Sequence, residues 1–127
     1  MPETGMMHIG ELAERTGLSL RTIRHYDQID LLAPSGRSEG GFRLYTEDDY
    51  NRLMLIRRMK PLGYSLEQMG DLLQALDSSR GDDASGADGE VALAGFLEDA
   101  RERRAKLAQQ LDAADEFIGL LSTQIAK

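Results

Sequence analysis

The feature that most limits the fold of this chain is a long row of apolar positions in its last third. The row repeats at alternating spacings of four and three residues, and its members are Leu93, Leu97, Ala100, Arg104, Leu107, Leu111, Ala114, Ile118, Leu121 and Ile125. Heptad spacing sustained over so many repeats predicts a coiled coil. Because a single helix cannot bury so narrow a stripe, we expect residues 91–127 to be a dimerisation helix. We expect Arg104, at a core position, to help fix its register.

The segment before this helix, residues 78–90, contains three glycines and no large apolar residue. This composition predicts a flexible acidic loop. The loop would separate an N-terminal domain, residues 1–77, from the dimerisation helix. The apolar stripe could also pack against the N-terminal domain of its own chain, and this alternative stays open.

The N-terminal domain begins with two short helices that meet at a glycine. Residues 10–16 show the apolar spacing of a short packed helix, and Gly17 ends it. Ser19 is a good N-cap for a second helix, from Leu20 to about Asp30, because its hydroxyl can accept a hydrogen bond from an unpaired backbone N–H. Two helices joined in this way predict a helix-turn-helix, in which the second helix enters the major groove of DNA.

The second helix has one face for packing and one for contacts. Leu20, Ile23 and Tyr26 lie on the side that can pack into a core. The opposite side is centred on Arg21 and His25, with Thr22 and Gln28 beside them and Arg24 at the flank. These residue types hydrogen bond to bases and phosphates, so we expect this face to bind DNA.

Residues 35–45, called the wing below, are rich in glycine, serine and charge before apolar and polar residues alternate from Phe42 to Tyr45. This pattern predicts a β-hairpin. Thr46 with Asp49, and Ser65 with Gln68, are capping-box pairs that predict two further helices. Pro61 and Gly63 mark the end of the first of these two helices.

The charge of the chain is unevenly distributed. Residues 1–64 are neutral overall, whereas residues 65–127 contain six basic and thirteen acidic residues and account for the whole net charge of −7. Between Arg15 and Lys60, nine basic residues face six acidic ones. A locally positive surface that attracts nucleic acid is therefore expected in this part.

Several classes of protein are disfavoured by the residues present. The chain has no cysteine and only two histidines, so we expect no disulfide, no transition-metal site and no cofactor. The carboxylates of residues 78–90 are interpreted as solvated rather than as a cation site. No catalytic constellation is seen, so we expect no enzyme. No secretory signal or apolar run of membrane-spanning length is present, and we expect a cytoplasmic protein with no membrane partner.

Five short motifs occur in one order: Ile9-Gly-Glu-Leu-Ala13, Thr22-Ile-Arg-His-Tyr-Asp27, Leu31-Leu32, Gly41-Phe-Arg-Leu-Tyr45 and Leu62-Gly-Tyr-Ser-Leu66. In this order and spacing the chain resembles the MerR family of bacterial transcription regulators over residues 6–76. Two positions depart from the usual pattern: His25 stands where a second aromatic residue is common, and Asp30 where glycine is common.

The resemblance implies a mainly α-helical fold: a winged helix-turn-helix with a small β wing, then a long C-terminal helix that pairs with its copy as an antiparallel coiled coil. It implies a dimer that binds a pseudo-palindromic promoter operator and distorts it, so that RNA polymerase engages both promoter elements. Carried over by motif, and combined with the helix faces, the DNA-binding residues expected are Ser19, Arg21, Thr22, Arg24, His25, Tyr26, Gln28, Arg37, Arg43, Tyr45 and Lys60.

The partners expected are double-stranded promoter DNA, a second copy of the chain and RNA polymerase. Since the sequence stops soon after the heptads, we expect a short form of the family without a large effector domain. A small-molecule or protein effector stays open. The alternative function is a protein-interaction adaptor that uses the winged domain and the acidic coiled coil, with incidental DNA contact.

Overall fold

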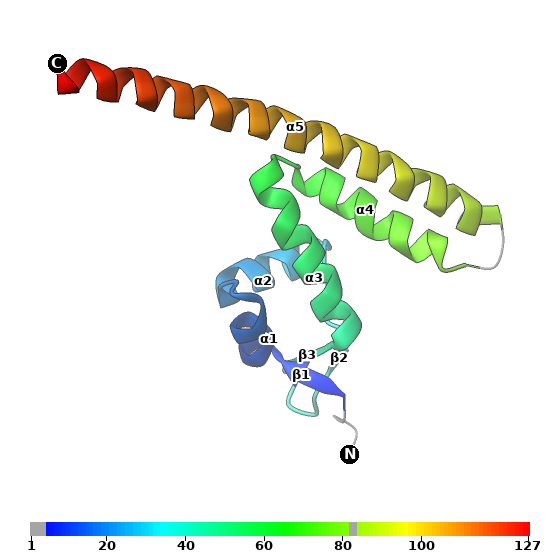
Figure 1. Ribbon diagram of the computed structural model, residues 1–127. Coiled ribbons are helices and arrows are strands. Elements are labelled where there is room, and N and C mark those ends of the chain that lie inside the picture. The colour runs from blue at the N-terminus through cyan, green and yellow to red at the C-terminus, as the bar shows by residue number, and fades with distance from the viewer. Residues whose placement is uncertain (1–4, 82–83) are drawn as a thin grey trace. The chain divides into compact units, whose positions relative to one another are not determined.

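The computed structural model describes residues 5–81 and 84–127, which divide between Leu73 and Gln74 into two compact units. The helices and strands, labelled in Figure 1, are β1 (Met6–His8), α1 (Ile9–Thr16), α2 (Leu20–Gln28), β2 (Gly36–Arg37), β3 (Arg43–Thr46), α3 (Glu47–Met59), the 3-10 helix η1 (Lys60–Leu62), α4 (Leu66–Ser79) and α5 (Ala84–Ala126). The mainly α-helical fold with a small sheet and a long C-terminal helix is therefore confirmed.

The helix-turn-helix forms as its local sequence predicts. Gly17 ends α1 in the left-handed region, with φ 76°, and its N–H donates to the carbonyl of Ala13 at 2.9 Å. The Ser19 hydroxyl then accepts from the N–H of Thr22 at 3.0 Å and caps α2. Leu12 of α1 and Ile23 of α2 are fully buried. The two helices are thereby fixed to each other by a shared core.

The second helix begins at Leu20 as predicted, but its end and the burial of its first residue differ from the prediction. It ends at Gln28 rather than near Asp30, and Asp30 has a positive φ of 58°. A left-handed residue cannot continue an α-helix, and short polar side chains such as aspartate tolerate this conformation better than most residues. At the other end, Leu20 is 39% exposed, so it lies at the edge of the core rather than inside it.

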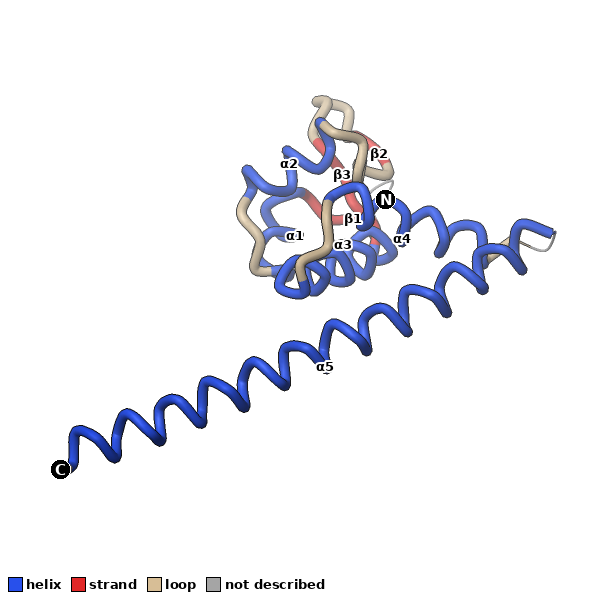
Figure 2. Tube along the Cα trace, turned by 90° about the horizontal axis from the view of Figure 1, so that it is seen from above, coloured by secondary structure: helices blue, strands red, loops and turns tan. Residues whose placement is uncertain are grey.

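The wing is a β-hairpin in a three-stranded antiparallel sheet of order β1-β3-β2 (red strands in Figure 2). Met7 of β1 pairs with Tyr45 of β3, and Gly36 of β2 pairs with Leu44. The strand β1 was not predicted, because three residues next to a helix have no recognisable pattern of their own. Pairing with β3 supplies the hydrogen bonds that make this segment a strand.

Burial in the wing departs from the expected alternation. Phe42, an apolar member of the alternating segment, is 68% exposed, whereas Leu44 and Tyr45 are both buried although neighbouring side chains of a strand point to opposite faces. Both faces of β3 are therefore covered at this point. The ring of Phe42 instead lies next to Gly40, 3.1 Å from the position that a Cβ on Gly40 would take. Phe42 therefore belongs to the end of the hairpin and not to the core.

Both predicted capping boxes are present. The Thr46 hydroxyl accepts from the N–H of Asp49 at 3.1 Å, and the Asp49 carboxylate accepts from the N–H of Thr46 at 2.9 Å, at the start of α3. Ser65 and Gln68 exchange the same two bonds before α4. Between α3 and α4, η1 contains Pro61 and ends at Gly63, with φ 87°. These local signals fix where the helices begin and end.

The extent of the acidic loop was predicted wrongly. Residues 78–90 were expected to be flexible, but α4 continues to Ser79 and α5 begins at Ala84. Two of the glycines that suggested a loop lie inside the helical hairpin and are buried. A Cβ on Gly89 would lie 2.4 Å from the Ser79 nitrogen and 2.7 Å from the Ala75 oxygen, and one on Gly86 would lie 2.3 Å from the Gly81 oxygen. These glycines therefore permit close backbone approach.

The last helix, α5, is one continuous helix of 43 residues in Figures 1 and 2. On the single chain, most of its predicted stripe is exposed, including Leu97, Leu107, Leu111, Ile118, Leu121 and Ile125. Leu93 and Ala100 are half-buried and Arg104 and Ala114 are exposed. The apolar face predicted from the heptads is therefore present and unpaired in one chain.

Candidate nucleic-acid interface

The predicted contact face of α2 is exposed. Arg21, Arg24, His25 and Gln28 all lie at the surface, and Thr22 is half-buried. Ile23 and Tyr26 on the opposite side are buried and anchor the helix. Ser19, also a predicted DNA contact, is exposed while its hydroxyl lies 2.9 Å from that of Thr22. The helix thus presents two guanidinium groups, an imidazole and an amide on one rigid face.

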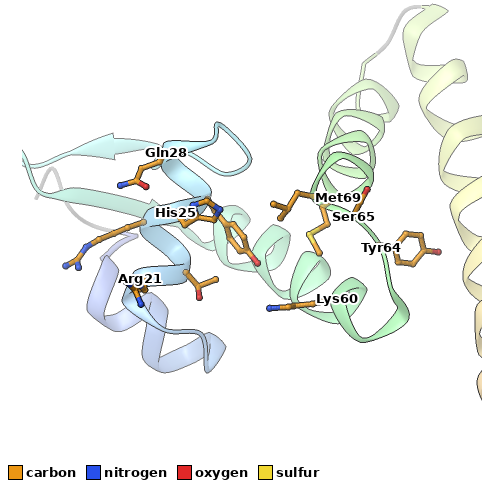
Figure 3. Close-up of a pocket in the computed structure, with 11 residues that line it drawn as sticks. Arg21, His25, Gln28, Lys60, Tyr64, Ser65 and Met69 are labelled. Atoms are coloured by element: carbon orange, nitrogen blue, oxygen red, sulfur yellow. The ribbon is translucent and has the colours of Figure 1, made fainter.

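An open pocket of about 870 Å³ lies beside this face. Its lining comes from α2, from η1 and the turn after it, and from the start of α4, and consists of Arg21, Thr22, Arg24, His25, Tyr26, Gln28, Lys60, Tyr64, Ser65, Leu66 and Met69. Figure 3 shows Arg21 and His25 on one side of the pocket and Lys60 and Met69 on the other. Seven of the predicted contact residues therefore line one concave surface.

The charge of the pocket is basic at its rim. Arg21, Arg24 and Lys60 are exposed, whereas Met69 is almost fully buried and forms part of an apolar floor. No carboxylate is among its lining residues. Basic side chains around an open concave surface attract a polyanion, and guanidinium and ammonium groups suit phosphate oxygens in particular.

The wing is bound to α2 by one carboxylate. Arg43 Nε donates to Asp27 Oδ2 at 2.8 Å, and Arg37 Nη2 lies 3.7 Å from the same oxygen. The Arg37 guanidinium also donates to the carbonyl of Gly41 at 3.1 Å. Arg37 and Arg43 were expected to contact DNA directly, and in this structure both are engaged within the protein. Arg37 is half exposed, so it can still present donors to an outside ligand.

The base of the wing is bound to α3 by a second carboxylate. Asp49 is buried, and its Oδ2 accepts from the Ser35 hydroxyl at 2.6 Å as well as from the Thr46 N–H. Ser35 and Thr46 flank the hairpin at its two ends. Asp27 and Asp49 together therefore fix the wing relative to α2 and α3. Neither aspartate was predicted to position the wing.

A further basic residue between Arg15 and Lys60 is also engaged within the protein. Arg15 of α1 forms an ion pair with Glu47, and its guanidinium carbon lies 4.1 Å from the centre of the Tyr50 ring. The hydrogen bond from Arg15 lowers the pKa of the Glu47 carboxyl and Glu47 raises the pKa of Arg15. Arg15 therefore joins α1 to α3, and the exposed positive surface is smaller than the charge count suggested.

The two tyrosines expected to donate to phosphates have different positions. Tyr45 is fully buried, and its hydroxyl has no hydrogen-bond partner among the described residues. Burial raises the pKa of this tyrosine. This position contradicts a direct DNA contact, because the ring packs in the sheet core. Tyr26 is also buried, with a pKa raised by burial, yet it lines the pocket.

Some pocket residues were missed by sequence reasoning. Tyr64, Ser65, Leu66 and Met69 follow the turn at Gly63 and line the pocket opposite α2. The motif from Leu62 to Leu66 was noted as a family feature but not as part of a site. The predicted contact at Lys60 could have pointed to these residues, because residues that follow Lys60 closely in the chain lie near it in space.

Within residues 5–81 and 84–127, no three histidine, aspartate or glutamate side chains gather in a way that could bind a metal ion. In the same residues, no helix has the length and hydropathy needed to cross a membrane.

An exposed basic helix in a helix-turn-helix, flanked by a wing, defines the class of DNA-binding transcription regulators. The chain belongs to the MerR family within this class. The family model for the MerR HTH family regulatory protein matches residues 7–76, and the MerR DNA-binding model matches residues 50–121. The resemblance noted from five motifs is thereby confirmed.

Two curated transcription regulators are similar to the N-terminal part of this chain. The HTH-type transcriptional regulator PA4778 of Pseudomonas aeruginosa is 49% identical over 67 residues, 53% of this chain and 51% of that protein. ZntR of Escherichia coli is 47% identical over 68 residues, 54% of this chain and 48% of that protein. The chain thus spans about half the length of these curated relatives.

A solved structure is similar over nearly the whole chain. It is HiNmlR, described as a MerR family regulator lacking the sensor domain and bound to promoter DNA. The TM-score is 0.70 at 26% identity, covering 95% of this chain and 88% of that chain. The similarity thus includes the C-terminal helix as well as the DNA-binding domain.

Proposed function

We propose that this protein is a homodimeric transcription regulator that binds a pseudo-palindromic promoter operator through α2 and distorts it to control transcription. The observation that carries this proposal is the exposed face of α2 together with the basic pocket beside it. Arg21, His25 and Gln28 have the donors and acceptors that contact base edges in a major groove. Arg24 and Lys60 suit the phosphates that flank the groove.

The geometry of the wing supports the same function. Asp27 binds Arg43 from the wing side of α2, so the wing and the contact face form one rigid body. A helix held in this way needs little ordering when it enters a groove, which favours affinity. Arg37, half exposed at the wing, supplies a further guanidinium for the DNA backbone.

The dimer in this proposal is supported by the unpaired stripe on α5. A single short helix makes too few base contacts for useful specificity, and two-fold symmetric proteins solve this by binding two half-sites. The exposed apolar side chains from Leu97 to Ile125 provide a surface for such pairing. HiNmlR, which is similar over nearly the full chain, is described as bound to promoter DNA.

The proposed partners are promoter DNA, a second copy of the chain and RNA polymerase at the bound promoter. The proposed location is therefore the bacterial cytoplasm, where these molecules occur. Because control of transcription requires no chemistry on a substrate, we assign no enzymatic role. We include an effector, either a small molecule or a protein, in this proposal and assign no binding site to it.

The experiment that tests DNA binding is selection from a pool of random double-stranded DNA. We expect the protein to enrich an inverted repeat and to bind it at least about a thousandfold more tightly than a scrambled duplex at physiological salt. The bound duplex should also show a bend when its two ends are labelled for energy transfer. Equal affinity for the selected and scrambled duplexes would overturn the proposal and favour the adaptor function.

A further inference from the structure

The apolar stripe of α5 is symmetric in sequence about Gln109. Each of its ten members has a counterpart at the same distance on the other side of this residue: Leu107 and Leu111 at two residues, Arg104 and Ala114 at five, Ala100 and Ile118 at nine, Leu97 and Leu121 at twelve, Leu93 and Ile125 at sixteen. A two-fold axis beside Gln109 would therefore place every core residue of one helix opposite a core residue of an antiparallel copy.

We infer that α5 pairs with a second copy of this chain in one antiparallel register, centred on Gln109, in which Arg101 of each chain lies beside the partner's Asp115. The inference rests on the proposed dimer and adds to it the register and the residues that select it. In that register all ten residues of the stripe lie in the interface between the two helices, which is called the seam below.

Side-chain size agrees with this register. The two alanines of the stripe, Ala100 and Ala114, each lie opposite a large residue, which is Ile118 for the first and Arg104 for the second. The remaining layers pair leucine with leucine or isoleucine. Alternating large and small side chains across a seam fills it evenly at ordinary helix spacing.

Charge agrees as well. In an antiparallel coiled coil, the positions that follow the core on one flank lie beside the same positions of the partner. On this flank of α5 lie Arg101, Ala108 and Asp115, seven residues apart. With the axis at Gln109, Arg101 lies beside the partner's Asp115 and Ala108 lies near the axis. Symmetry makes this ion pair occur twice.

Among the described residues of its own chain, Arg101 has one competing contact, and it is weak. Its Nη1 donates to Glu98 Oε1 at 3.0 Å, and both side chains are about two-thirds exposed. Exposed pairs of this kind contribute little to stability. Arg101 can therefore turn to the partner's Asp115 at small cost.

Other registers lose the ion pair and crowd Arg104. A slip of one heptad in either direction places Arg104 opposite a leucine, Leu107 or Leu121, instead of opposite the small Ala114. The same slip moves Arg101 away from the partner's Asp115, beside Ala108 or Ser122. A polar residue at a core position is a known means of fixing register. In the inferred register the small Ala114 leaves room for the long Arg104 side chain to extend its charged end toward water.

The flank on the other side adds an apolar contact. Phe117 is 63% exposed in the single chain and was not among the predicted dimerisation residues. In the register centred on Gln109 it lies beside the partner's Arg103. A ring next to a guanidinium and its methylene groups is buried favourably.

The register is measured with spin labels, since the chain has no cysteine of its own. Gly95 and Thr123 lie at equal distances from Gln109 on the outer face of the helix, and a Cβ on Gly95 would meet nothing within 4 Å. We would label Gly95→Cys and Thr123→Cys in separate proteins and measure the distance between the two copies by pulsed electron resonance.

We expect the same distance from both labels, about 42 Å along the helix axis at about 1.5 Å rise per residue. Slipping by one heptad would change one distance to about 52 Å and the other to about 31 Å, which would overturn the inferred register but keep the dimer. Two short distances, near the helix spacing, would mean a parallel pair and also overturn it. No dipolar coupling, with the mass of one chain, would overturn register and dimer together. Sequence-specific DNA retention by the same labelled proteins reports separately on the proposed function.

Discussion

Arg43 in the wing and Asp27 on α2 are joined by a hydrogen-bonded ion pair of 2.8 Å, in which both side chains are largely shielded from water. The pair connects the strand that ends the hairpin to the helix that presents the contact face. Arg37 lies near the same carboxylate. A single aspartate on the contact helix thus joins both arginines of the wing to α2.

Removal of this carboxylate should loosen the wing and reduce DNA specificity. In Asp27→Ala, Arg37 and Arg43 lose their common acceptor, so amide exchange in residues 36–46 should accelerate. The freed guanidinium groups should raise affinity for a scrambled duplex more than for the selected one, so the ratio of the two affinities should fall. Glu39→Ala, which removes the same charge from the wing, serves as the control. An unchanged ratio in Asp27→Ala would show that the wing holds its position without this carboxylate.

Close approach of α4 and α5 should make Gly89 intolerant of a side chain. The added methyl of Gly89→Ala would overlap backbone atoms of Ser79 and Ala75, and overpacking of this kind costs about 1–3 kcal/mol. Gly95→Ala is the matched control on the same helix, because its methyl meets nothing. That control should be more stable by about 0.5–1 kcal/mol through helix propensity. Thermal unfolding followed by circular dichroism measures both, and equal melting temperatures would contradict the close approach.

Arg104 should lower the stability of the proposed dimer and help to fix its register. In Arg104→Leu the seam becomes apolar throughout, so the dimer should become tighter and its melting temperature should rise. The distance distributions of the Gly95 and Thr123 labels should broaden at the same time, because slipped registers no longer place a charged side chain opposite a leucine. Arg80→Leu, outside the stripe, is the control for adding a leucine. A tighter dimer with unbroadened distances would show that other residues fix the register.

The N-cap of α2 should contribute to the stability of the fold. The Ser19 hydroxyl is the acceptor for the Thr22 N–H, and loss of an N-cap costs about 1 kcal/mol. Ser19→Ala should therefore unfold at a lower urea concentration, whereas Ser19→Asp, which keeps an acceptor, should retain most of the stability. If both substitutions leave the midpoint unchanged, the cap contributes nothing measurable to this helix.

The parts of the fold that could be predicted are those with a local physical cause. Gly17, Ser19, Thr46 with Asp49, and Ser65 with Gln68 act within a few residues of chain, and the structure has each of them where expected. The heptads of α5 are equally local, because a helix of known period determines which side chains share a face. The exposed face of α2 followed from the same periodicity.

The parts that failed depend on residues distant in the chain. The strand β1 exists because β3 pairs with it, and Gly86 and Gly89 indicate helix packing rather than a loop because α4 lies against them. Tyr45 looked like a surface donor by alternation, yet cover on both faces of β3 buries it. Arg43 looked free for phosphate until Asp27, sixteen residues earlier, was found beside it.

The most direct measurement of DNA binding by α2 is an anisotropy titration of the selected duplex at several salt concentrations. Three proteins are compared: the parent, Arg24→Ala on the contact face, and Lys127→Ala, which removes the same charge far along α5. The proposal predicts steep salt dependence for the parent and an affinity about tenfold lower for Arg24→Ala. The slope of log affinity against log salt should shrink by about 1.8 in that variant, one phosphate contact being lost at each half-site. Lys127→Ala should match the parent. Identical slopes and affinities for all three proteins would contradict the assignment of α2 as the DNA-binding helix.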